Sequence, residues 1–68
     1  MTRRVEYPHV NVRLVGEDGN VFAIVGRVTA ALRRAGERDA AKEFPARAFA
    51  CRSYDEVLRL VMETVEVE

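Results

Sequence analysis

The spacing of the apolar residues changes near position 20, and this change limits the folds that the chain can adopt. From His9 to Val15 apolar and polar residues alternate, as they do in a half-buried β-strand. After Asn20 the apolar residues recur every three or four positions, as they do on one face of an α-helix. We therefore expect a strand followed by a helix, with the turn-forming residues 16–20 between them.

The segment after Asn20 also permits a hairpin. Asp18-Gly19 lies between two apolar runs, which would make residues 21–25 a returning strand. The helical spacing favours the other interpretation, because it continues to Ala35 and the Asn20 side chain can accept a backbone N–H as an N-cap. We predict a helix over residues 21–35 that is closed by a glycine in the left-handed conformation. Its expected apolar face consists of Phe22, Val25, Val28, Leu32 and Ala35, and its expected closing residue is Gly36.

Two further helices and a strand are expected in the second half of the chain. Residues 39–50 have helical spacing, with Ala41, Phe44 and Ala48 on the inward face. Pro45 lacks an N–H and its ring clashes with a carbonyl one turn earlier, so we expect a kink or a break. The order Ser53-Tyr54-Asp55-Glu56 is typical of a capping box and predicts the start of the last helix. Residues 65–68 alternate and predict a short closing strand. The last helix should bury Tyr54, Val57, Leu58, Val61 and Met62.

These elements predict one small α+β domain, in the order β-α-α-α-β, with three helices packed on a two-stranded sheet. The domain should span residues 1–68, with residues 1–7 as a loosely ordered N-terminal arm. If successive helices run antiparallel, the two strands are parallel. Each strand then leaves an outer edge of unpaired backbone groups, so we expect a homodimer, for example one that joins two edges into a four-stranded sheet.

The charges of the chain are balanced, with 11 Lys and Arg residues against 11 Asp and Glu residues. This balance argues against bulk affinity for nucleic acid or for an anionic membrane. No apolar run approaches the roughly 18 residues of a membrane span, and the single cysteine, Cys51, excludes an internal disulfide framework. We therefore expect a cytoplasmic protein that makes no membrane contact.

Two groups of residues are candidate binding sites. The first is the loop before the first helix, where Gly16, Asp18, Gly19 and Asn20 could present backbone N–H groups to a ligand. Acidic residues in this loop would repel an anion, so a structural turn is the preferred interpretation. The second group could contact nucleic-acid phosphates, although a solvated basic face explains it more simply. Its members are Arg27, Arg33, Arg34 and Arg38.

The sequence contains few candidate catalytic residues, and each of them has a simpler structural interpretation. His9 is the only histidine and has no second metal ligand or nucleophile at an informative spacing. Cys51 lies just before a helix start, which could activate a thiol, but a small buried side chain in the turn is the simpler interpretation. Ser53 already has a capping role. We predict no catalytic residue, no cofactor and no metal site, and keep an enzyme that uses Cys51 or His9 as a third alternative.

Several segments together resemble a family of short uncharacterised bacterial and phage proteins. They are residues 7–16, Asp18-Gly19-Asn20 with the apolar residues after it, and Ser53-Tyr54-Asp55-Glu56. The resemblance covers nearly all of the chain and implies a strand, a turn, an apolar helix and a Ser-Tyr-Asp segment before the last helix. It implies no activity, and Pro45 and Arg52 depart from the pattern.

The sequence therefore favours a small protein that acts by protein–protein contact, either with itself or with a larger partner. Its basic first half and acidic second half could orient such a contact. The alternative is an accessory protein that contacts nucleic acid through the basic face of the first helix.

Overall fold

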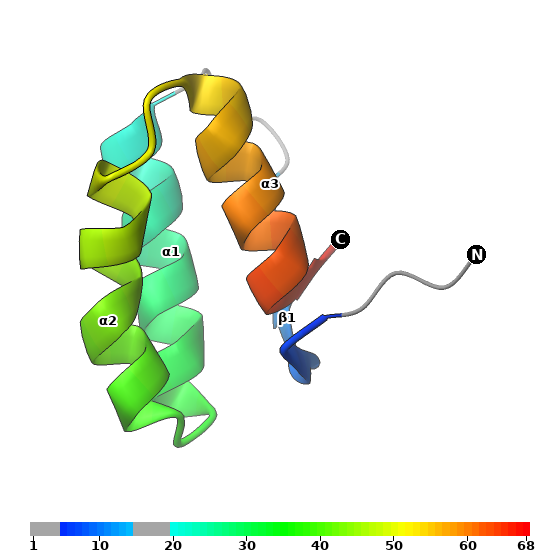
Figure 1. The fold of residues 1–68 in the computed structure, drawn as a ribbon. Coiled ribbons are helices and arrows are strands. Elements are labelled where there is room, and N and C mark those ends of the chain that lie inside the picture. Colours follow the sequence, from blue (N-terminus) through cyan, green and yellow to red (C-terminus); the bar gives the residue numbers. More distant parts are fainter. Residues whose placement is uncertain (1–4, 15–19) are drawn as a thin grey trace.

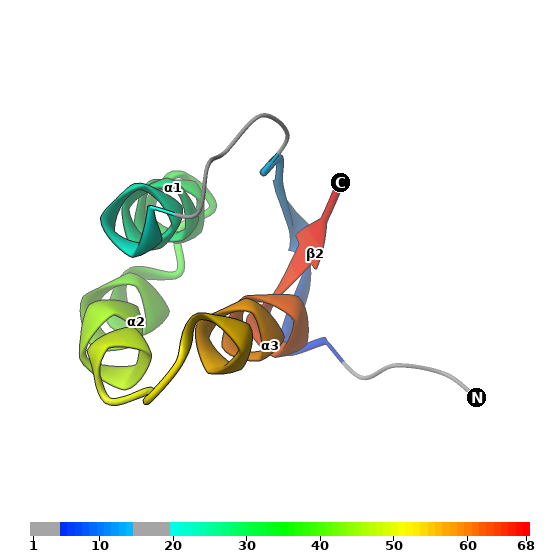
Figure 2. The ribbon, with the colours of Figure 1, turned by 90° about the horizontal axis from the view of Figure 1, so that it is seen from above.

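Three helices and two short strands make up the described part of the chain, residues 5–14 and 20–68 of a computed structural model. The elements are β1 (Tyr7–Val12), α1 (Val21–Arg34), α2 (Arg38–Phe49), α3 (Tyr54–Thr64) and β2 (Val65–Val67). Helices α1 and α2 lie side by side, and α3 and the strands lie beside this pair (Figures 1 and 2). The predicted α+β class and the predicted order of elements are confirmed.

Helix α1 shows that the segment after Asn20 is a helix and not a hairpin strand. The Asn20 Oδ1 accepts the Ala23 N–H at 3.2 Å, so the predicted N-cap is present. The chain leaves the helix at Gly36, whose φ of 85° lies in the left-handed region. Arg33 and Arg34 occupy the last turn, where they interact favourably with the helix dipole.

The buried face of α1 differs from the predicted one at both of its ends. Phe22 is 75% exposed, because a side chain six positions before Val28 points about 120° away from it on a helix. Ala35 is exposed because it is the C-cap, where the chain turns away. Ile24 and Ala31 are buried in their place.

A glycine within a helix costs about 1 kcal/mol relative to alanine, so Gly26 in the sequence suggests a close contact between the helix and a strand, and this prediction is wrong. This glycine is exposed, and a Cβ added to it would meet no atom within 4 Å. Gly26 therefore lies on the solvent side of α1 and not against a strand.

Helix α2 continues through Pro45 without a break. The proline leaves the Ala41 carbonyl without its usual donor, but the inward side chains Ala41, Phe44 and Ala48 are all buried as predicted. Their burial holds the segment helical, since tertiary packing contributes more to a protein helix than intrinsic propensity does.

Helix α3 begins where the sequence predicts. The Glu56 N–H donates to the Ser53 Oγ at 3.2 Å. Val57 and Val61 are buried and Leu58 is half-buried, but Tyr54 and Met62 are 38% and 40% exposed, so their predicted burial is wrong. Both lie at the margin of the inward face, whose centre is the pair of valines.

The two strands pair in parallel, as predicted, with Tyr7 opposite Val65 and Val12 opposite Val67. The register is irregular between Tyr7 and Asn11. Strand β1 begins two residues earlier and ends three residues earlier than the alternation indicates, so Tyr7 belongs to it. Of the expected N-terminal arm, residues 1–4 lie outside the described residues.

The core lies between the helices and the inner face of the sheet and is built mostly from small aliphatic side chains. Its largest member is Phe44, which is 1% exposed. Buried hydrophobic residues of the described chain are Val10, Val12, Ile24, Val25, Val28, Ala31, Leu32, Ala41, Phe44, Ala48, Val57, Val61 and Val65. The core is therefore filled, and candidate sites must lie on the surface around it.

Candidate functional site

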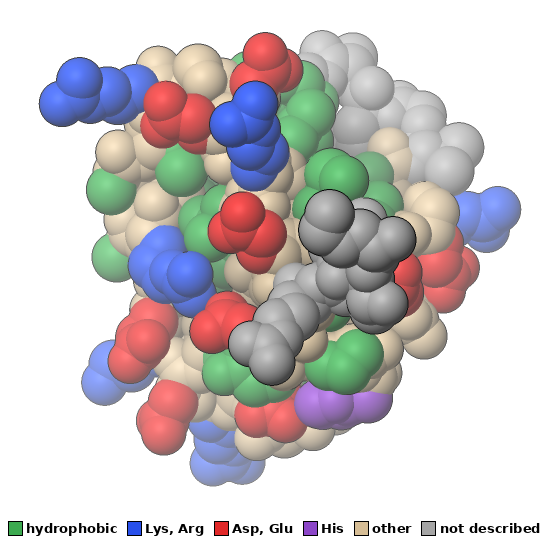
Figure 3. All heavy atoms as spheres, turned by 45° about the vertical axis from the view of Figure 1, so that its right-hand side comes forward, with side chains coloured by type: hydrophobic (Ala, Val, Ile, Leu, Met, Phe, Trp, Pro, Cys, Tyr) green, Lys and Arg blue, Asp and Glu red, His purple; other side chains and the backbone are tan. Residues whose placement is uncertain are grey.

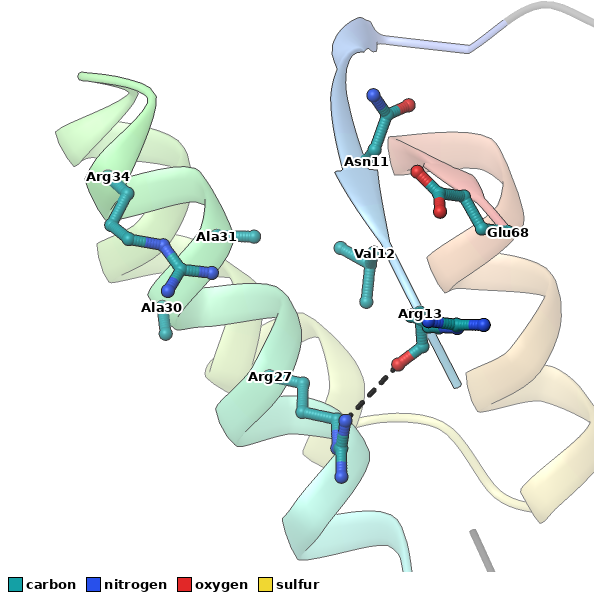
Figure 4. Close-up of a pocket in the computed structure, with 8 residues that line it drawn as sticks. All are labelled: Asn11, Val12, Arg13, Arg27, Ala30, Ala31, Arg34 and Glu68. Carbon is teal, nitrogen blue, oxygen red and sulfur yellow. Dashed lines mark hydrogen bonds between the residues drawn. The ribbon is translucent and has the colours of Figure 1, made fainter. Parts of the chain in front are cut away.

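The four arginines predicted as one basic face do not lie together. Arg27 and Arg34 line a groove between α1 and β1 (Figure 4). Arg33 and Arg38 line a separate hollow where α1 ends and α2 begins. Residues 33 and 34 are neighbours in sequence, but successive side chains on a helix point about 100° apart, so they face different sides. The predicted single patch is thus two sites.

The groove between α1 and β1 has a volume of about 390 Å³. Alanine side chains form its wall on α1, where Ala31 points toward Val12 of β1 (Figure 4). Three of its charged side chains are arginines and one is Glu68, so the groove favours an anionic ligand. We call this site the arginine groove. Its lining residues are Asn11, Val12, Arg13, Arg27, Ala30, Ala31, Arg34 and Glu68.

The outer edge of β1 opens onto the arginine groove. The Glu68 N–H donates to the Val12 carbonyl at 2.8 Å, so this carbonyl points toward β2. Successive carbonyls of a strand point in opposite directions, and the Arg13 carbonyl therefore points away from β2. There it accepts a hydrogen bond from the Arg27 Nη1 at 3.3 Å (Figure 4).

Arg13 is the one groove arginine that the sequence did not single out as a site residue. Alternation places it on the polar side of the strand, which is typical of an ordinary solvated side chain. The informative feature is its position just after β1, because consecutive elements usually pack side by side and a residue there reaches the adjacent helix.

The second hollow has a volume of about 460 Å³ and is lined by Arg33, Arg38, Ala41 and Lys42. Its three charged side chains are all basic, and Lys42 was not among the predicted residues. None of its lining residues lines the arginine groove, so the two sites are separate.

Among the described residues, the two most exposed large hydrophobic side chains are phenylalanines that touch each other. Phe22 is 75% exposed and Phe49 is 53% exposed, and their ring centroids are 5.4 Å apart at an angle of 45°. They meet because the first turn of α1 lies beside the last turn of α2, at one end of the helix pair (Figure 1). We call this pair the aromatic surface.

Of the predicted loop site, only Asn20 lies within the described residues, and its side chain caps α1. Gly16, Asp18 and Gly19 lie outside them.

His9 and Cys51 both have structural neighbours. The His9 Nε2 is 3.0 Å from the Glu37 Oε2 in an exposed contact, and the His9 and Tyr7 ring centroids are 6.3 Å apart in an edge-on arrangement. The Cys51 thiol is half-buried and lies 3.5 Å from the Arg47 carbonyl. Within the described ranges, no three His, Cys, Asp or Glu side chains come together to hold a metal ion.

Charges of both signs are interspersed with apolar side chains on the face that Figure 3 brings forward. The face shown in Figure 3 therefore has no dominant charge. No helix in the described part of the chain is long and apolar enough to cross a membrane.

No family model, curated protein or solved structure matches the chain. The resemblance to short bacterial and phage proteins therefore stays a prediction, and the candidate sites are argued from their geometry alone.

Proposed function

We propose that this domain acts by protein–protein contact through the aromatic surface, without catalysis. The observation that carries the proposal is the exposed pair Phe22 and Phe49, at 75% and 53% exposure. The chain has only three phenylalanines, and a core this small would gain from burying each of them. Full burial of one phenylalanine contributes roughly 1.5–3 kcal/mol. Two rings held together at the surface are the kind of anchor that protein interfaces use.

A second copy of the chain is the first partner to consider. The net charge of the chain is zero, so two copies meet without strong electrostatic repulsion. A symmetric contact would place the aromatic surface of one copy against that of the other and would bury four rings. Joining the outer strand edges into a four-stranded sheet is the alternative arrangement of such a homodimer. A larger partner would use the same aromatic surface.

Sedimentation equilibrium at micromolar concentration tests self-association. We expect a dimer for the native chain and a monomer for the Phe22→Ser, Phe49→Ser double variant. Met62→Ser is the matched control, because Met62 is an exposed apolar side chain on α3 outside the aromatic surface. A dimer that survives the double variant would assign the contact to the strand edges instead.

A photoreactive phenylalanine analogue at position 49 distinguishes a second copy of the chain from a larger protein partner. Crosslinking at twice the mass of the chain identifies a second copy, and a heavier product that requires the analogue at this position identifies a larger partner. A native chain that is monomeric and gives neither product contradicts the proposal.

Contact with nucleic acid is the second candidate function, and the all-basic hollow of Arg33, Arg38 and Lys42 favours it. Phosphate contacts by these side chains would make binding fall steeply with salt. The test is the affinity for duplex and single-stranded DNA as a function of salt, for the native chain and for Arg33→Gln with Arg38→Gln. Absence of binding at low ionic strength would exclude this function.

A further inference from the structure

The outer edge of β1 and the arginines beside it form a second surface, distinct from the aromatic surface. We propose that the arginine groove binds an extended acidic peptide segment, which adds to the outer edge of β1 as a further strand. The proposal goes beyond the contact proposed above and does not depend on it. The two requirements of such a ligand, an extended backbone and negative side chains, come from different observations.

The backbone requirement follows from the direction of the β1 carbonyls. The Val12 carbonyl is used by β2, whereas the Arg13 carbonyl points into the groove. By the same alternation, the backbone groups of Asn11 point to the groove side. A peptide that runs along this edge can hydrogen-bond to these groups in the manner of strand addition.

The Arg13 carbonyl remains able to accept a bond from the peptide. A carbonyl oxygen has two lone pairs, and the contact from Arg27 occupies one of them at a length of 3.3 Å. A peptide N–H can therefore share this oxygen. The exposed guanidinium of Arg27 then lies directly beside the added strand.

The charge requirement follows from the side chains around the edge. Arg13, Arg27 and Arg34 line the groove, with Glu68 as its one acidic member. A guanidinium can bind a carboxylate through two parallel hydrogen bonds, so Asp or Glu side chains of the peptide fit this surface. A nucleic acid would meet the same arginines, but its phosphate backbone offers no regular N–H donors to the β1 carbonyls.

The size of the groove sets the length of the segment. A volume of about 390 Å³ is near the lower end of the range for ligand pockets, roughly 300–1,000 Å³. It suits a few residues of one strand and not a folded domain. Val12 and Ala31 are buried at the base of the groove, whereas the small side chain of Ala30 is exposed and leaves room for an alternate apolar side chain of the peptide (Figure 4).

Fluorescence anisotropy with a labelled peptide of alternating valine and glutamate tests this proposal. We expect saturable binding of this peptide. Binding should weaken roughly tenfold or more when glutamine replaces every glutamate, because the carboxylates that pair with the groove arginines are then lost. N-methylation of alternate peptide nitrogens should weaken binding as strongly, because it removes the donors that strand addition needs. Equal binding of the glutamine or the N-methylated peptide would overturn the proposal.

Protein variants locate the site. Arg27→Gln with Arg34→Gln should reduce the affinity for the glutamate peptide roughly tenfold or more, whereas Arg33→Gln with Arg38→Gln should leave it unchanged. Both pairs remove two positive charges from the same part of the chain, so a general charge effect would lower the affinity for the peptide equally in the two double variants. An equal loss of affinity would therefore contradict the proposal. Single-stranded DNA that binds the groove as tightly as the peptide would also contradict it.

The failure of this proposal can be distinguished from failure of the proposed function. The Phe22→Ser, Phe49→Ser variant should bind the glutamate peptide with native affinity, because the aromatic surface is not part of the groove. Circular dichroism of every variant verifies that the helices are intact before binding is compared.

Discussion

The Glu56 carboxylate accepts the Arg52 backbone N–H at 2.9 Å, one residue before the N-cap Ser53. In a capping box the acidic side chain would return to the N–H of the cap residue itself. Here Ser53 still accepts the Glu56 N–H, so two donors at the start of α3 are satisfied, but one of them belongs to the preceding turn. The cap therefore also holds the connection between α2 and α3.

Removing the Ser53 hydroxyl should destabilise the domain. Ser53→Ala leaves the Glu56 N–H without its acceptor, for a loss of about 1 kcal/mol in the free energy of unfolding. In a domain of this size, such a loss lowers the Tm by roughly 4–8 °C. Thermal unfolding followed by circular dichroism measures it. Ser53→Asp keeps an acceptor oxygen and should retain most of the stability, and an equal loss in both variants would contradict the capping role.

The two glycines near α1 should respond to alanine in opposite directions. Gly26→Ala adds a methyl group where nothing lies within 4 Å, so it should raise the free energy of unfolding by roughly 0.5–1 kcal/mol. Gly36→Ala forces a Cβ into a backbone with φ of 85° and should lower it by roughly 1–2 kcal/mol. Urea unfolding of both variants provides the comparison, and changes of the same sign would contradict it.

Replacing Pro45 should stabilise α2. Pro45→Ala restores an N–H that can donate to the Ala41 carbonyl, with an expected gain of roughly 1–3 kcal/mol. Part of the gain is offset because proline also restricts the unfolded chain. Pro45→Gly restores the same donor with a poor helix former, so it should be less stable than Pro45→Ala by about 1 kcal/mol. Chemical denaturation distinguishes the three proteins.

Phe44 and Phe49 should differ sharply in their contribution to stability. Phe44→Ala removes the largest buried side chain and should cost about 3–5 kcal/mol. A chain of 68 residues has a total stability of roughly 3–10 kcal/mol, so this variant should lose a large part of its stability. Phe49→Ala removes a side chain that is 53% exposed and should cost less than about 1 kcal/mol. Comparable losses would mean that the aromatic surface is part of the core.

Local rules predicted the elements of this fold well. Asn20 and Ser53 each cap a helix through their own side chains, and Gly36 adopts the left-handed conformation that ends α1. Each of these features depends on atoms within four residues along the chain. Such short-range geometry can be read from residue types alone.

The predictions that were wrong concern features that depend on tertiary packing and not on local sequence. Phe22 fits a spacing of three or four residues, yet it lies outside the angle that β1 and α2 cover. Gly26 indicated a close contact, but its position on the far side of α1 depends on how the helix is rotated. Pro45 indicated a kink or a break, whereas burial of its neighbour Phe44 keeps the helix continuous.

The candidate sites depended even more on tertiary placement. Arg33 and Arg34 point about 100° apart on α1, but the site that each of them lines depends on where β1 and α2 lie around this helix. Arg27 on α1 donates to the carbonyl of Arg13, which directly follows β1, and this contact requires α1 and β1 to be packed together.

The pairing of β1 with β2 has a consequence for the order of folding. The strands flank all three helices in sequence, so a helix pair such as α1 and α2 can form from neighbouring residues, whereas the sheet requires closure of a long loop. Such non-local pairing slows folding. We therefore expect the helices to assemble early and the sheet to form last. Only the fully folded domain then has an outer edge of β1 to which a peptide can bind.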